Sequence, residues 1–310
     1  MTEGTASRDR HRGALLGLAC GDAVGTALEF SPRGSFEPIS DMIGGGPFGL
    51  LPGEWTDDTS MALCIGRSLI EMGDFDARDQ MERFCRWHRG GYLSSNGRCF
   101  DIGNTVWAAL DRYRRTGDPY SGSTDPASAG NGSIMRLAPV AIFFSRDVEA
   151  AVHHSIESSR TTHACQEVLD ACRLFGWQLT RALDGAAKQD LISAESFPGR
   201  HDRDLSPSIH AIVEGGYCTK SEHQIRGTGY VVESLEAALW CFQSTNTYRD
   251  AVLAAANLGD DADTTAAVCG QLAGAHYGAS AIPPEWRERL AMRDEIEAMA
   301  DALREASPVS

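Results

Sequence analysis

The sequence lacks the long apolar run that a membrane-spanning helix requires, because no stretch approaches roughly 18 apolar residues. Its first residues are polar and contain no apolar segment of the kind found in secretion signals. Basic residues are scarce: 28 Lys and Arg stand against 43 Asp and Glu, and the formal net charge is −15. This charge disfavours a nucleic-acid-binding surface. We therefore expect a cytoplasmic protein that binds neither nucleic acid nor membrane.

The nine cysteines are scattered and include no C-x-x-C pair. Isolated cysteines in apolar surroundings predict buried free thiols in a reducing compartment, rather than disulfides or a zinc site. The sequence also lacks the glycine-rich nucleotide-binding fingerprints, the G-x-S-x-G elbow and the H-E-x-x-H zinc motif. The sequence therefore gives no support for a nucleotide-binding fold, an α/β-type serine hydrolase or a zinc protease of these types.

Apolar residues recur at helical spacing rather than in alternation. In 13–30 glycines interrupt the apolar pattern, which is tolerated where helices pack closely or where a ligand meets the backbone. The expected helices span 13–30, 59–72, 76–89, 103–113, 135–144, 163–183, 231–242, 248–258, 263–277 and 284–304. With no convincing strand between them, the predicted fold class is all-α.

Three polar loops separate these helices, at 31–54, 115–132 and 197–228. Loops of this length are uncommon in a folded domain unless they are functional, and the last is the best candidate for a flap. None shows a change in composition that marks a second domain. We therefore expect a single domain over 1–310, with frayed ends at about 1–10 and 306–310.

Two acidic segments each stand at the start of an expected helix, WTDDT at 55–59 and GDDADTT at 259–265. Asp and Thr are good N-cap residues, so capping alone would explain either segment. Together, however, they supply more carboxylates than capping uses, and adjacent carboxylates repel each other unless a cation neutralises them. Asp261 and Asp263 can face one point, and Thr264 can add its hydroxyl. Such oxygen ligands suit Mg²⁺, Mn²⁺ or Ca²⁺, so the two segments predict a divalent-metal site.

Three further positions have an ordinary explanation when taken alone. Asp101 begins a helix, and capping would account for it. The segment 130–133 (GNGS) could bind a phosphate through its backbone, but taken alone it is more often a plain turn. His163 lies at a helix start, where a lone histidine is more often a capping or surface residue than a catalyst.

The order of the motifs carries more information than any one of them. They are GLACGDAVGTALEF at 17–30, TDDT at 56–59, DIGNT at 101–105, AGNGSIMR at 129–136, TH at 162–163, GYVVESL at 229–235, DADTT at 261–265 and LAGAHYG at 272–278. In this order the sequence resembles the ADP-ribosylglycohydrolase family, and most closely its bacterial dinitrogenase-reductase-activating glycohydrolases. The resemblance runs from about 13 to 286.

The resemblance implies an orthogonal, all-α domain that holds two divalent cations, Mg²⁺ or Mn²⁺, between the two acidic helix starts. The metal-ligand roles that it implies fall on Thr56, Asp57, Asp58, Asp261, Asp263 and Thr264. The catalytic roles fall on Glu29 and Asp101, with Glu29 close enough to the metals to ligate one of them. The substrate contacts fall on Asn131, Gly132, Ser133, His163 and Tyr230.

The function implied by the resemblance is metal-dependent release of ADP-ribose from ADP-ribosylated arginine side chains of a protein, by a monomeric enzyme. One alternative is a hydrolase of the same fold that acts on serine-linked, nucleic-acid-linked or small-molecule ADP-ribose. Others are a binding relative that has lost the chemistry and an immunity protein that blocks a toxin by occlusion as well as by hydrolysis. The intact acidic set disfavours a binding relative without activity. The short segment 1–12 before the first motif disfavours the immunity protein.

The sequence departs from the family pattern at one position. The family usually reads G-G-D-x-D at the second acidic segment, whereas Asp260 stands here in place of the second glycine. A side chain there could disturb close backbone packing or add a further acceptor near the metals. Because no expected ligand is lost, we expect activity to be retained.

Overall fold

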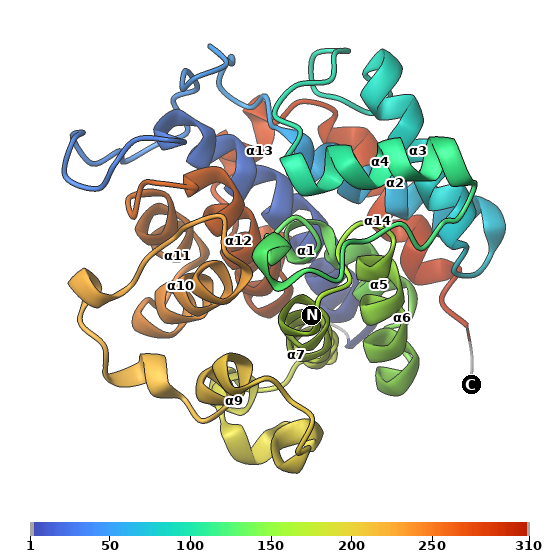
Figure 1. Ribbon diagram of the computed structural model, residues 1–310. Coiled ribbons are helices and arrows are strands. Elements are labelled where there is room, and N and C mark those ends of the chain that lie inside the picture. The colour runs from blue at the N-terminus through green and yellow to red at the C-terminus, as the bar shows by residue number, and fades with distance from the viewer. Residues whose placement is uncertain (1–2, 309–310) are drawn as a thin grey trace.

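The computed structural model describes residues 3–308, in which helices account for the regular structure and strands are limited to three isolated bridges. The α-helices are α1 (Glu3–Gly25), α2 (Asp57–Met72), α3 (Ala77–Gly90), α4 (Asn104–Thr116), α5 (Ala138–Phe143), α6 (Val148–Arg160), α7 (Gln166–Leu183), α8 (Lys188–Ile192), α9 (Pro207–Val213), α10 (Val231–Ser244), α11 (Tyr248–Ala256), α12 (Ala262–Tyr277), α13 (Pro284–Arg289) and α14 (Arg293–Glu305). The all-α prediction is confirmed. In Figure 1, α1 lies at the centre, with α10 and α11 on one side and α5 and α6 on the other.

The pairing of α1 with α12 organises the fold. Glycines recur every four residues along α1, and a β-carbon added at Gly17 or Gly21 would lie 2.3 Å or 2.2 Å from a carbonyl oxygen of α12. The two backbones are therefore in direct contact, which a larger residue would prevent. Gly13 faces Gly274 and Gly25 faces Ala262, so the helices are antiparallel. The C-terminal end of α1 consequently lies beside the N-terminal end of α12.

Several boundaries differ from those predicted. The expected helix 284–304 is two helices, because Met292 is left-handed (φ 53°) and the Ala291 N–H donates to the Gly53 carbonyl instead of continuing a helix. Helix α6 was not predicted, since its buried face consists of small residues (Ala151, Ser155, Ser158 and Ser159) and gives little apolar periodicity. The expected loop 197–228 contains α9 and short 3-10 turns.

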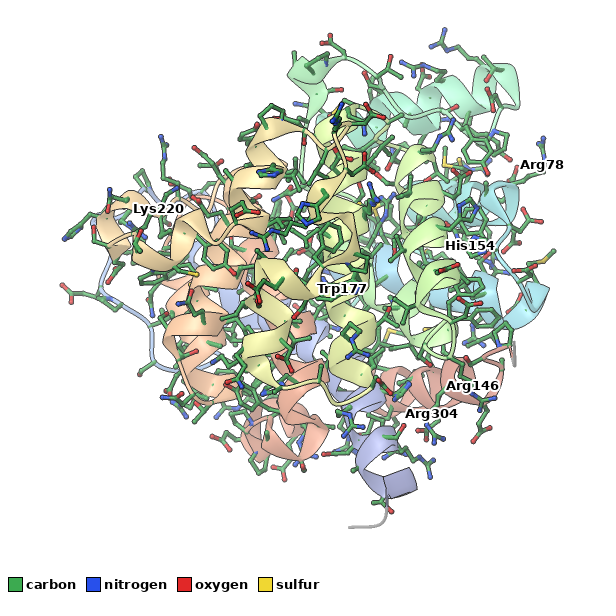
Figure 2. All side chains as sticks on the ribbon, turned by 90° about the horizontal axis from the view of Figure 1, so that it is seen from below. Arg78, Arg146, His154, Trp177, Lys220 and Arg304 are labelled. Atoms are coloured by element: carbon green, nitrogen blue, oxygen red, sulfur yellow. The ribbon has the colours of Figure 1, made fainter. Side chains whose placement is uncertain are left out.

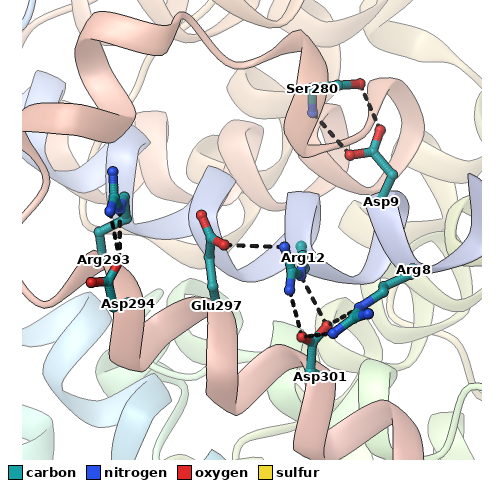
Figure 3. A network of polar contacts seen from close by, with 8 residues as sticks. All are labelled: Arg8, Asp9, Arg12, Ser280, Arg293, Asp294, Glu297 and Asp301. Carbon is teal, nitrogen blue, oxygen red and sulfur yellow. Dashed lines mark hydrogen bonds and ion pairs between the residues drawn. The ribbon is translucent and has the colours of Figure 1, made fainter. Parts of the chain in front are cut away.

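The structure describes α1 from Glu3 onward, inside the range 1–10 for which the sequence predicts a frayed end. Two arginines of α1 bind α14: Arg8 and Arg12 both donate to Asp301, and Arg12 also donates to Glu297 (3.1 Å), as Figure 3 shows. Asp9 accepts from the backbone N–H and the hydroxyl of Ser280 (3.0 and 2.7 Å). These contacts hold the first turns of α1 against the body of the protein. Residues 1–2 and 309–310 lie outside the described part of the chain.

The described residues also bear on two other expectations. All nine cysteines are free thiols, and seven of them are buried. Over residues 3–308, no helix is both long and apolar enough to cross a bilayer.

Candidate active site

The starts of α2 and α12 lie against each other at the C-terminal end of α1. The Thr56 hydroxyl hydrogen-bonds to Asp263 Oδ2 (3.2 Å), and the Thr264 hydroxyl donates to Asp58 Oδ1 (3.3 Å). These contacts join residues that are 207 and 206 positions apart in the chain. The two acidic segments of the sequence therefore converge.

Asp22, which the sequence did not single out, holds the start of α2 in place. It is fully buried, and it accepts hydrogen bonds from the backbone N–H groups and the hydroxyls of Thr56 and Thr59 at 2.6–3.1 Å. Thr56, the N-cap residue of α2, makes no side-chain cap bond of its own. A carboxylate from α1 thus takes the place of a local cap. Asp22 lies inside the motif at 17–30, but only the packing of α1 on α2 reveals this role.

Glu29, Asp101 and Asp263 form a tight carboxylate cluster, in which one oxygen of each residue lies within 4.8 Å of the others. Burial, with the charge of Asp101 as the next cause, raises the pKa of Glu29 to about 10. Burial likewise raises the pKa of Asp101 to about 7 and the pKa of Asp263 well above its ordinary value. Without a cation, part of this cluster therefore remains protonated at neutral pH.

The carboxylate oxygens of this site are suited to bind a divalent cation. Glu29 Oε2, Asp58 Oδ2 and Asp263 Oδ1 are buried and have no hydrogen-bond partner among the described residues. Burial also raises the pKa values of Asp57, Asp58 and Asp261, so the whole set is destabilised in its charged form. Mg²⁺ and Mn²⁺ prefer carboxylate oxygens as ligands, and these buried oxygens have no hydrogen-bond donor that would compete with a cation.

A cleft of about 720 Å³ opens above the carboxylates. The predicted site residues that line it are Glu29, Asp57, Asp101, Asn131, Gly132, His163, Asp261 and Thr264. Asn131 links its two walls, because its side-chain amide donates to Asp261 Oδ2 (2.6 Å) and to Ser234 Oγ (3.2 Å). Asn131 thereby fixes one oxygen of Asp261 and leaves the other free for a ligand.

His163 forms a neutral floor under the glycines of 130–132. A β-carbon added at Gly132 would lie 2.8 Å from His163 Cε1, so the position requires glycine. Burial lowers the pKa of His163 to about 3, which keeps the ring uncharged. Arg136 Nη2 donates to the Thr162 hydroxyl (2.6 Å), which lies 2.9 Å from His163 Nδ1. The Thr162 hydroxyl thus connects the Arg136 guanidinium to the His163 ring.

Two residues expected to contact substrate lie outside the cleft wall. Ser133 is buried, and its hydroxyl pairs with that of Ser159 (2.9 Å). The Tyr230 hydroxyl donates to Glu167 Oε2 (2.8 Å), and the ring lies at the surface beside Gly229.

The cleft also includes residues that the sequence did not reveal. Phe30 is 64% exposed and left-handed (φ 58°). Arg226 also lines the cleft and has no ion-pair partner among the described side chains. Phe30 directly follows Glu29 and is the last residue of the motif at 17–30. No pattern around Arg226 marks it, because only the fold brings the loop before α10 to the cleft.

The ADP-ribosylglycohydrolase family model matches residues 3–310. The chain belongs to this family. It is 49% identical over 300 residues to the ADP-ribosylarginine hydrolase Tri1 of Pseudomonas putida, with 97% of this chain and 79% of that protein covered. It is 32% identical to the ADP-ribosyl-[dinitrogen reductase] glycohydrolase of Rhodospirillum rubrum, with 97% of each chain covered. A solved structure titled ADP-ribosylglycohydrolase-related protein complex superposes with a TM-score of 0.88, at 43% identity, and covers 98% of this chain and 100% of that one.

The ADP-ribosylglycohydrolase pattern has a glycine where this chain has Asp260. The backbone conformation at this position shows why glycine suits it. Asp260 adopts φ 55°, in the left-handed region that favours glycine. Its N–H donates to the Ser31 carbonyl (2.8 Å) and its carbonyl accepts from the Phe30 N–H (2.7 Å), so two left-handed residues brace each other. The Asp260 side chain lines the cleft instead of disturbing the packing.

Proposed function

We propose that this chain is a divalent-metal-dependent hydrolase that releases ADP-ribose from ADP-ribosylated arginine side chains of a protein. The convergence of the two acidic helix starts with Glu29 and Asp101, under a cleft with a neutral histidine floor, carries the proposal. Relatives at 49% and 44% identity, from Pseudomonas putida and Serratia proteamaculans, are named ADP-ribosylarginine hydrolases, which favours arginine over other linkages.

We assign two cations, Mg²⁺ or Mn²⁺, to the acidic set. The residues that would hold them are Thr56, Asp57, Asp58, Asp261, Asp263 and Thr264, with Glu29 beside them. Divalent cations in such a site lower the pKa of bound water and orient hydroxyl groups of a sugar. The unpartnered oxygens of Asp58 and Asp263 support this assignment.

The reaction breaks the bond from ribose C1″ to a guanidinium nitrogen and adds water at C1″. The leaving nitrogen must gain a proton, and the water must lose one. Asp101 lines the cleft beside the acidic set, where it can give a proton to the leaving nitrogen and take one from the water. Glu29 lies within 4.8 Å of Asp101 and can hold the second proton of the pair. Positive charge that develops on the sugar is stabilised by the neighbouring carboxylates.

The other wall of the cleft suits the remainder of the substrate. His163 presents Nε2 near Gly130, where the ring nitrogen lies 3.4 Å from the position of an added β-carbon. Arg226 supplies a positive charge for the diphosphate. We further propose that the chain works as a monomeric, single-domain cytoplasmic enzyme, which the nine free thiols support.

The test is incubation with a protein ADP-ribosylated on arginine, in parallel with a serine-linked substrate, in Mg²⁺, Mn²⁺ or EDTA. We expect release of free ADP-ribose from the arginine substrate with either metal and none in EDTA. Asp101→Asn should lose most of the turnover, while Asp170→Asn, a buried aspartate of α7 outside the cleft, should retain it. Release from serine alone, or equal release in EDTA, would overturn the proposal.

A further inference from the structure

A second cavity, of about 460 Å³, lies at the N-terminal end of α1 and is independent of the proposed function. Three arginines from three elements line it: Arg10 from α1, Arg146 from the turn before α6, and Arg304 from α14. Figure 2 shows Arg146 and Arg304 near each other at the same edge of the molecule. Along α1, His11 of this cavity is separated from Gly25 by about 20 Å, so the cavity and the cleft lie at opposite ends of the helix.

These arginines have few partners inside the protein. Arg10 uses Nε to donate to the Leu183 carbonyl (2.8 Å), and Arg146 reaches only the Ser307 carbonyl at 3.4 Å. Arg304 has no hydrogen bond or ion pair among the described residues. Each guanidinium carries five N–H donors, so most of the donors around the cavity are free.

The nearby carboxylates are already engaged. Asp301 of α14 binds Arg8 and Arg12 (Figure 3), and Asp147 caps α6 through the Ala150 N–H (3.0 Å). Asp184, which lines the cavity, pairs with Arg181 at 3.1 Å and is 67% exposed at its side chain. No described carboxylate lies within 4 Å of the nitrogens of Arg10, Arg146 or Arg304.

His11 lies at the base of the cavity and is neutral. Its Nδ1 hydrogen-bonds to the Ser7 carbonyl (2.7 Å), which requires a proton on Nδ1, and its Nε2 therefore accepts from the Ser145 hydroxyl (3.2 Å). Burial, opposed by the Ser7 bond and reinforced by the three arginine charges, lowers the pKa of His11 to about 4. The charge around the cavity thus comes from the arginines.

We propose that this cavity binds a small phosphate-bearing anion through Arg10, Arg146 and Arg304. Three like charges around one cavity repel one another, and no described carboxylate pairs with any of them to offset this repulsion. Guanidinium groups are suited to bidentate binding of phosphate oxygens. The cavity volume lies within the range of small-molecule sites and exceeds that of a single phosphate, which favours a diphosphate or a phosphorylated metabolite.

The test is isothermal titration with inorganic pyrophosphate and with AMP, in EDTA and without ADP-ribose, because the diphosphate of ADP-ribose would itself compete for the cavity. The variant is Arg146→Gln with Arg304→Gln, which leaves the structural bond of Arg10 intact. The matched control is Arg67→Gln with Arg78→Gln, which removes the same charge from α2 and α3; Figure 2 shows Arg78 apart from the cavity. Circular dichroism melting checks that all three proteins fold.

We expect the wild type and the control to bind one equivalent of pyrophosphate or AMP. Each arginine removed should weaken the affinity roughly ten-fold, so the cavity variant should bind about 100-fold more weakly. The absence of binding in the wild type, or equal affinity in the wild type and the cavity variant, would overturn the proposal. A loss shared equally by the control would also overturn it, because it would show that net charge and not the cavity is responsible.

Discussion

Replacing Asp263 by asparagine keeps the shape of a central side chain and removes one of three clustered charges. Two unit charges 4.8 Å apart repel by about 3.5 kcal/mol at an effective dielectric constant of about 20. Protonation already relieves part of this repulsion in the metal-free protein. We therefore expect Asp263→Asn to stabilise the metal-free protein by about 1–3 kcal/mol at pH 8, or about 1.5–4.5 °C in melting temperature.

The sign of the pH dependence follows from the raised pKa values. Glu29 and Asp101 have folded pKa values of about 10 and 7, above those of the unfolded chain. The folded state then binds more protons than the unfolded state, so stability is full at about pH 4 and falls as the pH rises. Metal-free wild type should thus melt at a lower temperature at pH 8 than at pH 5.5, and Asp263→Asn should reduce this difference.

Divalent metal should reverse the order of the two proteins. A cation at 100 times its dissociation constant adds about 2.7 kcal/mol to the stability of a protein that binds it only when folded. In differential scanning fluorimetry, Mn²⁺ should raise the melting temperature of the wild type and of Asp170→Asn, and should leave Asp263→Asn nearly unchanged. A full metal response in Asp263→Asn, together with wild-type turnover, would refute the placement of the metal centre.

Two other predictions concern the helix pair and the cleft. Gly21→Ala puts a β-carbon 2.2 Å from the Ala266 carbonyl oxygen and should lower the free energy of unfolding by about 1–3 kcal/mol in denaturant titrations. Gly4→Ala, where nothing lies within 4 Å of the added β-carbon, should leave it unchanged. Equal effects of the two substitutions would contradict direct backbone contact between α1 and α12. Arg226→Gln should raise KM for the ADP-ribosylated substrate about ten-fold with little change in kcat, and Arg226→Lys should recover part of the loss. The exposed Arg203→Gln is the control, and an unchanged KM in Arg226→Gln would remove Arg226 from substrate binding.

The sequence predicted the parts of this protein whose signal is local. The two acidic segments stand at helix starts, and the apolar stripe of α2 gave that helix to within two residues at its start. The prediction from sequence missed α6, whose buried face consists of small residues. It also missed the break at Met292, where the chain changes direction without glycine or proline. The periodicity argument depends on large apolar side chains, so a helix buried through serine and alanine gives it little to detect.

The role of Asp22 needed information that no local pattern contains. Asp22 is a buried charge in a glycine-rich helix, and the sequence around it offers no partner. Its partners are four hydrogen-bond donors of Thr56 and Thr59, which α2 brings beside it. The same holds for Asn131, whose amide becomes meaningful only when Asp261 lies 2.6 Å away. Both residues were inside recognised motifs, yet their partners lie 34 and 130 positions away in the chain.

The glycines of α1 connect the core of the protein to its chemistry. Because Gly21 and Gly25 lie against the backbone of α12, the register between the two helices is set by contacts that no side chain can adjust. A shift of α1 by a single residue would move it by about 1.5 Å along α12 and rotate it by about 100°. Glu29, which follows α1, would then leave the 4.8 Å cluster that it forms with Asp263. The glycine repeat therefore sets the spacing of the carboxylates, and close helix packing is a condition for the metal site rather than a separate property of the fold.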